Sequence, residues 1–358
     1  MTVKRAPNGT YTVQFRCKDA EGRELHKFRR GFATRSKAEE WERDYKATRG
    51  QSMAMKFYDF LKIYEEDMRP RLRETTWATK QHMIDTKIKP YFGQMRMEDI
   101  RGIDIIQWQN KLINSRRSNG EAYSPTYLRT INNQLNAIFN HASRYYGLNP
   151  NPAVKTMKIG AREAREMSFW TKEEYLKFSE AMMEKPRSFI MFEILYWTGI
   201  RVGELLALVP ESFDLVSMEM RITSSYQRLD GQDLITDPKT PKSVRTIKIP
   251  EFLNEEIREY LDSRQDVRNG ERVFKVTKHY LAHEMKRGCA ATGVKRIRIH
   301  DLRHSHVSLL IDMGFSALAI ADRLGQEAID VTFRYAHLFP SVQEDMATAL
   351  NESRGDDL

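Results

Sequence analysis

The chain has 358 residues, 41% of them hydrophobic and 30% charged, so it exceeds one ordinary domain and is neither a fibre nor a wholly disordered protein. Lys and Arg number 58 against 49 Asp and Glu, which gives a net charge of +9. An excess of this sign favours a polyanionic partner, because basic groups near phosphates release condensed counterions.

The chain contains only two cysteines, Cys17 and Cys289, each far from any cluster of Cys and His. A disulfide framework and a structural zinc site are therefore not expected, and a reducing compartment fits. No apolar run approaches the ~20 residues that a membrane span needs, and the N-terminus lacks a signal-peptide core. We expect a cytoplasmic protein without membrane contact.

Residues 1–50 are predicted to form a small sheet with one helix. Tyr11, Val13 and Phe15 alternate with polar residues, which is the period of a half-buried strand. Turn residues follow, and then one or two further strands up to Phe32. This segment is the first predicted domain.

A helix should follow these strands, because Ser36 and Glu39 form a capping box. The first 50 residues carry 13 Lys and Arg against 7 Asp and Glu, which is +6 of the total +9. We expect this module to bind DNA, although the alternative is that its charges form a plain solvated surface. The predicted DNA contacts are Lys4, Arg5, Arg16, Lys27, Arg29 and Arg30.

Residues 55–153 are predicted to form a helical domain. From Phe57 onward, large apolar residues recur at i, i+3, i+4 and i+7, the spacing of one helical face. Ser124 as N-cap and Pro125 at the first helical position begin a longer helix. We interpret these apolar stripes as core, and residues 154–168, which are basic and poor in large apolar side chains, as a linker.

A third domain is predicted over residues 169–358, with a C-terminal tail. It begins at a capping box formed by Thr171 and Glu174. Four polar clusters lie within it. Each alone has a simpler interpretation than catalysis, so their significance depends on their order along the chain.

The first two clusters contain a basic residue at a chain reversal. Gly199 ends one predicted helix, and Arg201 lies where the next begins, a place where free backbone N–H groups favour an anion. Glu204 would hold the guanidinium, although a surface ion pair would look the same. Lys239 is expected at the tip of a hairpin, where most lysines are simply solvated.

The other two clusters lie near the C-terminus. His300 and Arg303 are three residues apart and thus neighbours on one helical face. His304 and His306 lack the carboxylate or Cys spacing of a zinc site, so we interpret them as core or surface histidines. Tyr335 would be unremarked alone, since a phenol with a pKa near 10 is a poor nucleophile at neutral pH.

Taken together, the order Arg, Lys, His-x-x-Arg and a late Tyr resembles the tyrosine recombinase family of phage and conjugative-transposon integrases. The local sequences TGIRVGELLAL, PKT, HDLRHSH and YAHLFP resemble it too. The resemblance implies that Tyr335 attacks a phosphodiester, forms a 3′-phosphotyrosine and releases a 5′-hydroxyl. It assigns the remaining roles as follows: Arg201 and Arg303 clamp the non-bridging oxygens, Lys239 protonates the leaving oxygen, and His300 helps Tyr335 lose its proton.

One position departs from the family pattern. Gln326 follows Leu324 and Gly325 where the family usually has His or Trp, a phosphate contact beside the nucleophile. An amide can still donate a hydrogen bond to a phosphate oxygen, but it cannot take up a proton near neutral pH. We include Gln326 in the predicted site as a hydrogen-bond donor.

The predicted architecture is multidomain and mainly α with small β-sheets. It comprises an N-terminal three-stranded sheet plus helix, a helical core-binding (SAM-like) domain and a mixed α/β catalytic domain. The resemblance implies a bacterial, DNA-associated enzyme that needs neither metal nor other cofactor. Its expected partners are double-stranded DNA at core and arm-type sites, three further copies of itself, a directionality factor and a host DNA-bending protein.

Two other functions remain open. A type IB topoisomerase-like enzyme would use the same chemistry without exchanging partner strands, and only a recombinase would generate Holliday junctions. A non-catalytic DNA-binding regulator derived from an integrase would retain DNA binding but form no covalent adduct.

Overall fold

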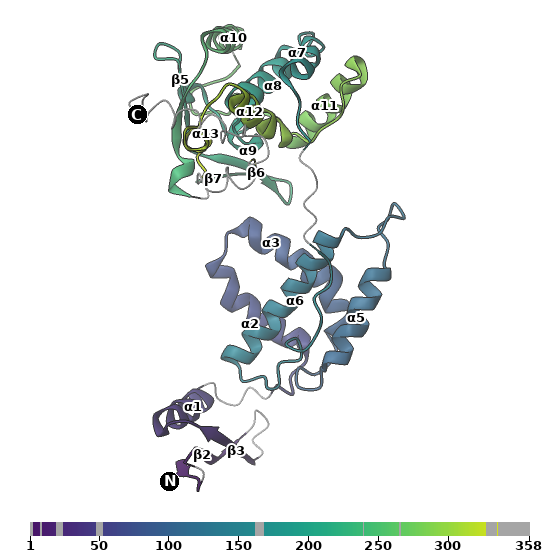
Figure 1. Cartoon of the computed structure of the whole chain (residues 1–358), viewed down its shortest axis with the longest axis vertical. Coiled ribbons are helices and arrows are strands. Elements are labelled where there is room, and N and C mark those ends of the chain that lie inside the picture. The colour runs from purple at the N-terminus through teal and green to yellow at the C-terminus, as the bar shows by residue number, and fades with distance from the viewer. Residues whose placement is uncertain are drawn as a thin grey trace, which may run out of the picture. The chain divides into compact units, whose positions relative to one another are not determined.

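In a computed structural model that describes residues 3–7, 9–18, 24–47, 53–161, 168–238, 240–264, 266–326 and Tyr335, the chain forms two compact units, Met1–Ala164 and Arg165–Leu358 (Figure 1). The first unit contains two separate hydrophobic clusters, one in the N-terminal sheet and one among helices. No helix of the described ranges is long and apolar enough to cross a membrane. The predicted architecture, mainly helical with small sheets, is confirmed.

The N-terminal sheet is antiparallel, in the order β1 (Val3–Arg5), β2 (Tyr11–Lys18) and β3 (Glu24–Phe32), and α1 (Arg35–Ala47) follows it. The predicted alternation is confirmed, because Val13 and Phe15 are buried together with Ala38 of the helix. The predicted capping box is wrong. Ser36 lies inside the first turn, and the Thr34 hydroxyl accepts the hydrogen bond from the Lys37 N–H instead, at 3.3 Å.

The helical part of this unit has one core, formed mainly by aromatic and branched side chains. As predicted, the Ser124 hydroxyl caps its longest helix by accepting from the Tyr127 N–H at 3.3 Å. A π turn precedes Pro90, whose missing N–H cannot continue the α-helical ladder. The elements are α2 (Phe57–Met68), η1 (Arg69–Arg71), α3 (Glu74–Met83), η2 (Ile84–Ile88), α4 (Lys89–Phe92), α5 (Gly102–Asn114) and α6 (Pro125–Tyr145).

The second unit begins with α7 (Lys172–Glu180), whose capping box of Thr171 and Glu174 is confirmed. Its central helix, α8 (Pro186–Thr198), is buried on nearly all sides, and Tyr175 stacks on Tyr196 within the core. The first half continues with α9 (Val202–Leu205), η3 (Pro210–Ser212), β4 (Phe213–Asp214), β5 (Glu219–Ile222), β6 (Ser225–Leu229) and β7 (Gln232–Thr236).

The second half of this unit contains η4 (Pro241–Ser243), β8 (Arg245–Lys248), α10 (Glu251–Asp262), α11 (Lys278–Thr292), α12 (Asp301–Asp312) and α13 (Ala317–Leu324). The strands make a sheet of order β4-β5-β8 and a separate hairpin of β6 and β7. The predicted hairpin around Lys239 is therefore wrong, because the strands on either side of that position, β7 and β8, belong to different sheets. Lys239 itself lies outside the described residues.

Candidate active site

Arg201 lies in the sharp connection between α8 and α9, as predicted. Gly199 ends α8 in the left-handed conformation (φ +65°), and Arg201 is the N-cap residue of α9. The Glu204 carboxylate accepts from the Arg201 guanidinium at 2.7 Å and from the Arg201 backbone N–H at 3.0 Å. The carboxylate therefore fixes both the backbone and the side chain of Arg201, whose guanidinium stays partly exposed.

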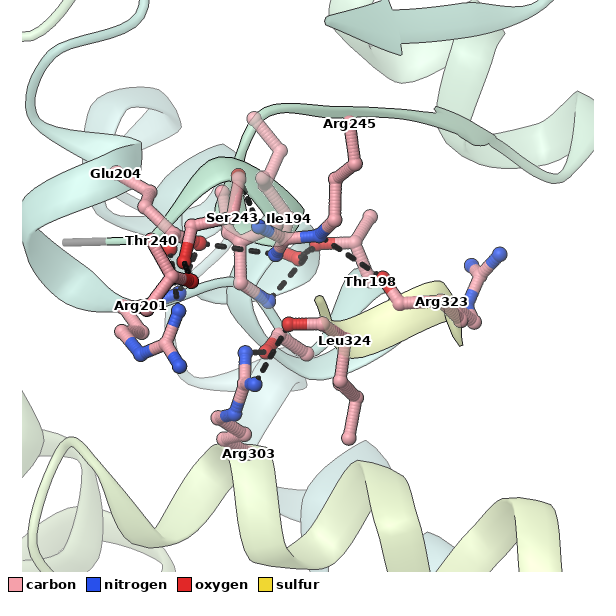
Figure 2. A network of polar contacts seen from close by, with 12 residues as sticks. Ile194, Thr198, Arg201, Glu204, Thr240, Ser243, Arg245, Arg303, Arg323 and Leu324 are labelled. Atoms are coloured by element: carbon pink, nitrogen blue, oxygen red, sulfur yellow. Dashed lines mark hydrogen bonds and ion pairs between the residues drawn. The ribbon is translucent and has the colours of Figure 1, made fainter. Parts of the chain in front are cut away.

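Glu204 is buried and joins Arg201 to a second arginine, Arg245 of β8 (Figure 2). The Arg245 guanidinium donates to the other carboxylate oxygen at 2.9 Å and also to the backbone carbonyls of Ser243 and Arg323, at 3.0 Å each. Burial alone would raise the pKa of Glu204, but Arg245 and Arg201 more than offset it, so the pKa lies below its usual value. Arg245 was not among the predicted site residues.

Arg303 of α12 is almost fully buried and binds two backbone carbonyls. Its guanidinium donates to the carbonyl of Gly199 at 2.7 Å and to that of Leu324 at 2.8 Å (Figure 2). Burial and then repulsion from Arg201 lower the pKa of Arg303 to about 9, which still leaves it charged at neutral pH. The Arg201 and Arg303 guanidinium groups repel each other, and that of Arg201 is partly exposed. Binding of an anion beside them would therefore be favourable.

The C-terminal end of α13 is held by these same arginines. Carbonyls in the last turn of a helix lack partners within the helix. Here Arg245 donates to the Arg323 carbonyl and Arg303 to the Leu324 carbonyl. Gln326 follows directly, with its N–H bonded to the Ala321 carbonyl at 2.9 Å, and is half-buried. The arginine network thus fixes the backbone that carries Gln326.

His300 is the N-cap residue of α12 and is exposed. Partial desolvation of the imidazole, and then the positive charges of Arg303 and Arg201, lower its pKa below the usual value. His300 is therefore neutral at physiological pH and able to accept a proton. His300 and Arg303 lie three residues apart at the start of α12, so the imidazole and this guanidinium share one end of the helix.

Tyr335 is buried against α12 and α13, in a cluster with Val307, Ile311 and Leu324. Its hydroxyl is hydrogen-bonded to Nδ1 of His304. Of the two interpretations given for His304, core or surface, its burial supports the first, but its contact with Tyr335 was not predicted. Its spacing of four residues from His300 was the available signal, since i and i+4 share a helical face.

The predicted DNA contacts of the N-terminal sheet lie on two faces. Strand alternation and pairing place Arg5, Lys27 and Arg29 on the face of Val13 and Phe15, and Arg29 lies 5.4 Å from the ring of Trp41 in α1. The opposite face carries the other three: Lys4, Arg16 and Arg30, with the exposed Phe28 ring 4.6 Å below the Arg30 guanidinium.

Three family models match the chain. The phage integrase family model matches residues 168–341, the phage integrase N-terminal SAM-like domain residues 56–113, and the Arm DNA-binding domain residues 1–48. Over 98% of this chain and 100% of the relative, the sequence is 27% identical to the ICEBs1 integrase of Bacillus subtilis. It is also 27% identical to the integrase of Mycobacterium phage L5, over 77% of each chain.

Solved structures show the same fold. The Tn1549 transposon integrase, solved with transposon right end DNA, has a TM-score of 0.65 at 17% identity, over 82% of this chain and 98% of that one. A lambda integrase dimer bound to a core site has a TM-score of 0.58 at 18% identity, over 92% and 94%. The matches to the phage integrase family models, together with the full-length relative, identify the chain as a member of the tyrosine recombinase family, of the phage integrase type.

Proposed function

We propose that this chain, a tyrosine-type site-specific recombinase, cuts and rejoins DNA at the attachment sites of a mobile element with Tyr335 as its nucleophile. The observation that carries the assignment is the arrangement of Arg201 and Arg303. Arg201 is joined through Glu204 and Arg245 to the end of α13, to which Arg303 also donates. Arg303 lies on α12, against which the buried Tyr335 packs. A scissile phosphate is the anion that both the charge and the family membership favour.

In the proposed reaction the Tyr335 oxygen attacks phosphorus, and the bond to the 5′ oxygen breaks. Arg201 and Arg303 would neutralise the non-bridging oxygens as their charge grows in the transition state. The Arg201 guanidinium is fixed by Glu204 before DNA arrives, so little reorganisation is needed on binding. Lys239 is assigned to protonation of the leaving 5′ oxygen, His300 to helping Tyr335 lose its proton, and Gln326 to a neutral hydrogen bond.

Because the phosphotyrosine conserves the energy of the phosphodiester, rejoining requires no nucleotide cofactor. Four protomers on two duplexes would exchange strands through a Holliday junction; a lambda integrase tetramer has been solved bound to such a junction. The Arm DNA-binding match supports accessory-site binding by the N-terminal module. A directionality factor and a host DNA-bending protein would then choose between integration and excision.

The attachment sites of this protein are not known in advance, so the test lets the protein select them from genomic DNA. Full-length protein is incubated with fragmented genomic DNA, denatured with SDS, and the covalently bound DNA is sequenced. We expect one recurrent core sequence. Two duplexes carrying that sequence should then yield Holliday junctions with wild-type protein. Nicking and closing without junctions would favour the topoisomerase-like alternative, and recovery of no covalent DNA would favour the non-catalytic regulator.

A further inference from the structure

The contact between His304 and Tyr335 has no role in the mechanism as assigned so far. His304 lies on α12, one turn after His300, and is buried. Its Nδ1 is the hydrogen-bond partner of the Tyr335 hydroxyl, and the two rings lie 5.6 Å apart between centroids. The His300 ring lies edge-to-face with the His304 ring, with 5.3 Å between their centroids.

We propose that His304 is a catalytic residue that accepts the proton of Tyr335 during cleavage and returns it during ligation. This inference rests on the proposed function. A buried imidazole in direct contact with the nucleophile meets the geometric requirement for a general base. For Nδ1 to accept, the neutral ring carries its hydrogen on Nε2. His304 would then take the proton-accepting role that the resemblance gives to His300, and His300 would be left to act at the phosphate.

The step balances without a further reagent. The Tyr335 O–H bond breaks and its proton moves to His304 Nδ1, while the tyrosine oxygen forms a bond to phosphorus. The bond between phosphorus and the 5′ oxygen breaks, and that oxygen takes a proton from Lys239. In ligation the 5′-hydroxyl returns its proton to Lys239 and attacks phosphorus, and the leaving tyrosine oxygen recovers its proton from the His304 imidazolium.

The burial of Tyr335 explains why it would need a proton acceptor on the neighbouring helix α12. The phenol is buried among Val307, Ile311 and Leu324, so water and hydroxide have restricted access to its proton. In such a setting the phenolate is costly unless the proton moves to a partner already in contact. Arg303, on the same helix, adds a positive charge that favours the anion without accepting the proton.

The first experiment tests whether His304 acts as a general base or only as a hydrogen-bond partner of Tyr335. In His304→Asn the side-chain amide can occupy the position of Nδ1 and bond to the phenol, but it cannot take up a proton. Single-turnover formation of the covalent adduct is measured on a core-site duplex, and on the same duplex with sulfur in place of the scissile 5′ oxygen. A thiolate leaves without protonation, so the second substrate bypasses the leaving-group acid.

We expect His304→Asn to slow cleavage of both substrates by roughly 100-fold or more, the usual contribution of a general base, with DNA affinity unchanged. A variant of the leaving-group acid, Lys239→Ala, should be rescued by the sulfur substrate. The matched control is His279→Asn at an exposed position of α11, which should cleave at the wild-type rate. Cleavage by His304→Asn within threefold of wild type, or its rescue by sulfur, would overturn the proposal.

A second measurement needs no change at His304. In full-length protein labelled with ¹⁵N-histidine, replacing Tyr335 by Phe removes only the phenolic oxygen. The Nδ1 resonance of His304 should shift, whereas that of His279 should not. An unshifted His304 resonance would overturn the proposal even if His304→Asn failed to fold. Failure of the proposed function looks different, because wild-type protein would then form no adduct that depends on Tyr335.

Discussion

Gln326 is the side chain whose role can be tested most sharply, because it stands where the family usually has His or Trp. Its backbone is held by the arginine-bound end of α13, so its position does not depend on its own side chain. A neutral hydrogen bond to a charged group contributes about 1.5–3 kcal/mol, which corresponds to roughly ten- to a hundredfold in rate.

Gln326→Ala should therefore slow single-turnover cleavage by roughly ten- to a hundredfold, and Gln326→His should be tolerated. Arg303→Ala should cost far more, because it also leaves the carbonyls of Gly199 and Leu324 unpaired. The measurement is the rate of covalent adduct formation at saturating protein. An alanine variant that cleaves at the wild-type rate would remove Gln326 from the site.

At the scale of single residues, contacts between residues close in the sequence could be predicted, whereas contacts between residues far apart in the sequence were missed. The contact of Arg201 with Glu204 spans three residues and follows from helical spacing. Arg245 lies 41 positions from Glu204, and its contact depends on how β8 packs beside α9. His304 was interpreted as a core or surface histidine, and its contact with Tyr335 was missed because Tyr335 lies 31 positions away.

The end of α8 shows how one element positions the site. Gly199 adopts a left-handed conformation, and a Cβ at this position would lie 2.5 Å from the ring of His306 and 2.9 Å from Leu324. Gly293, at the end of α11, has nearly the same conformation (φ +72°), but nothing lies within 4 Å of a Cβ placed there. The two glycines therefore share a backbone conformation but differ in the crowding around a Cβ.

Gly293→Ala should lower the free energy of unfolding by about 1 kcal/mol, the cost of a left-handed alanine. Gly199→Ala should cost several times more, because the clash adds to the backbone strain. It should also reduce cleavage, since the Gly199 carbonyl accepts from Arg303. Denaturant unfolding of both variants checks the comparison, and equal losses of stability would contradict the crowding argument.

In helix α10 the carboxyl group of Glu256 lies where its ionised form is unfavourable. One oxygen of Glu256 is buried and has no hydrogen-bond partner among the described residues. Burial and then the charge of Glu193 raise the pKa of Glu256 from 4.5 to about 7. The folded chain thus holds this proton more tightly than the unfolded chain, so the contribution of Glu256 to stability falls as pH rises from 4.5 to 7.

Glu256→Gln should therefore be more stable than wild type at pH 7.5, by about 1 kcal/mol once solvent screening of this half-exposed group is considered. The advantage should vanish near pH 4.5. Its neighbour Glu255 is exposed on the same helix, so Glu255→Gln serves as the control. Chemical denaturation across this pH range is the measurement, and a pH-independent difference between Glu256→Gln and wild type would rule out the argument.

Element prediction succeeded where a local signal decided the outcome. The cap of α6 by Ser124 and the capping box of α7 follow from short spacings. The capping box at Ser36 failed by two residues, because Thr34 offered an equally good hydroxyl earlier. The expected hairpin at Lys239 failed because strand partners are chosen by tertiary packing, which placed β7 with β6 and β8 with β5.

At the scale of the whole molecule, the N-terminal module is predicted to bind accessory DNA through the sheet face that α1 does not cover. Replacing Lys4, Arg16 and Arg30 together by Gln removes three positive charges from that face. Affinity for accessory sites should fall, and the salt dependence of binding should become shallower by about three phosphate contacts. Cleavage of a short core-site duplex should persist, as it should after deletion of residues 1–50.

The control removes the same charge elsewhere. Arg221, Arg258 and Lys275 are exposed in the second unit, and replacing all three by Gln lowers the net charge by the same amount. If both triple variants lose equal affinity for accessory sites at one stated salt concentration, overall charge explains the binding and the sheet face does not.

The central claim is that Tyr335 forms the covalent bond to DNA. The most direct measurement traps the adduct on a recovered core site, digests the protein and the DNA, and identifies the modified peptide by mass spectrometry. We predict a nucleotide joined through its 3′ phosphate to Tyr335, and no adduct with Tyr335→Phe although that variant still binds DNA. A 5′ linkage, a modified residue other than Tyr335, or an SDS-resistant complex with the Phe variant would contradict the account.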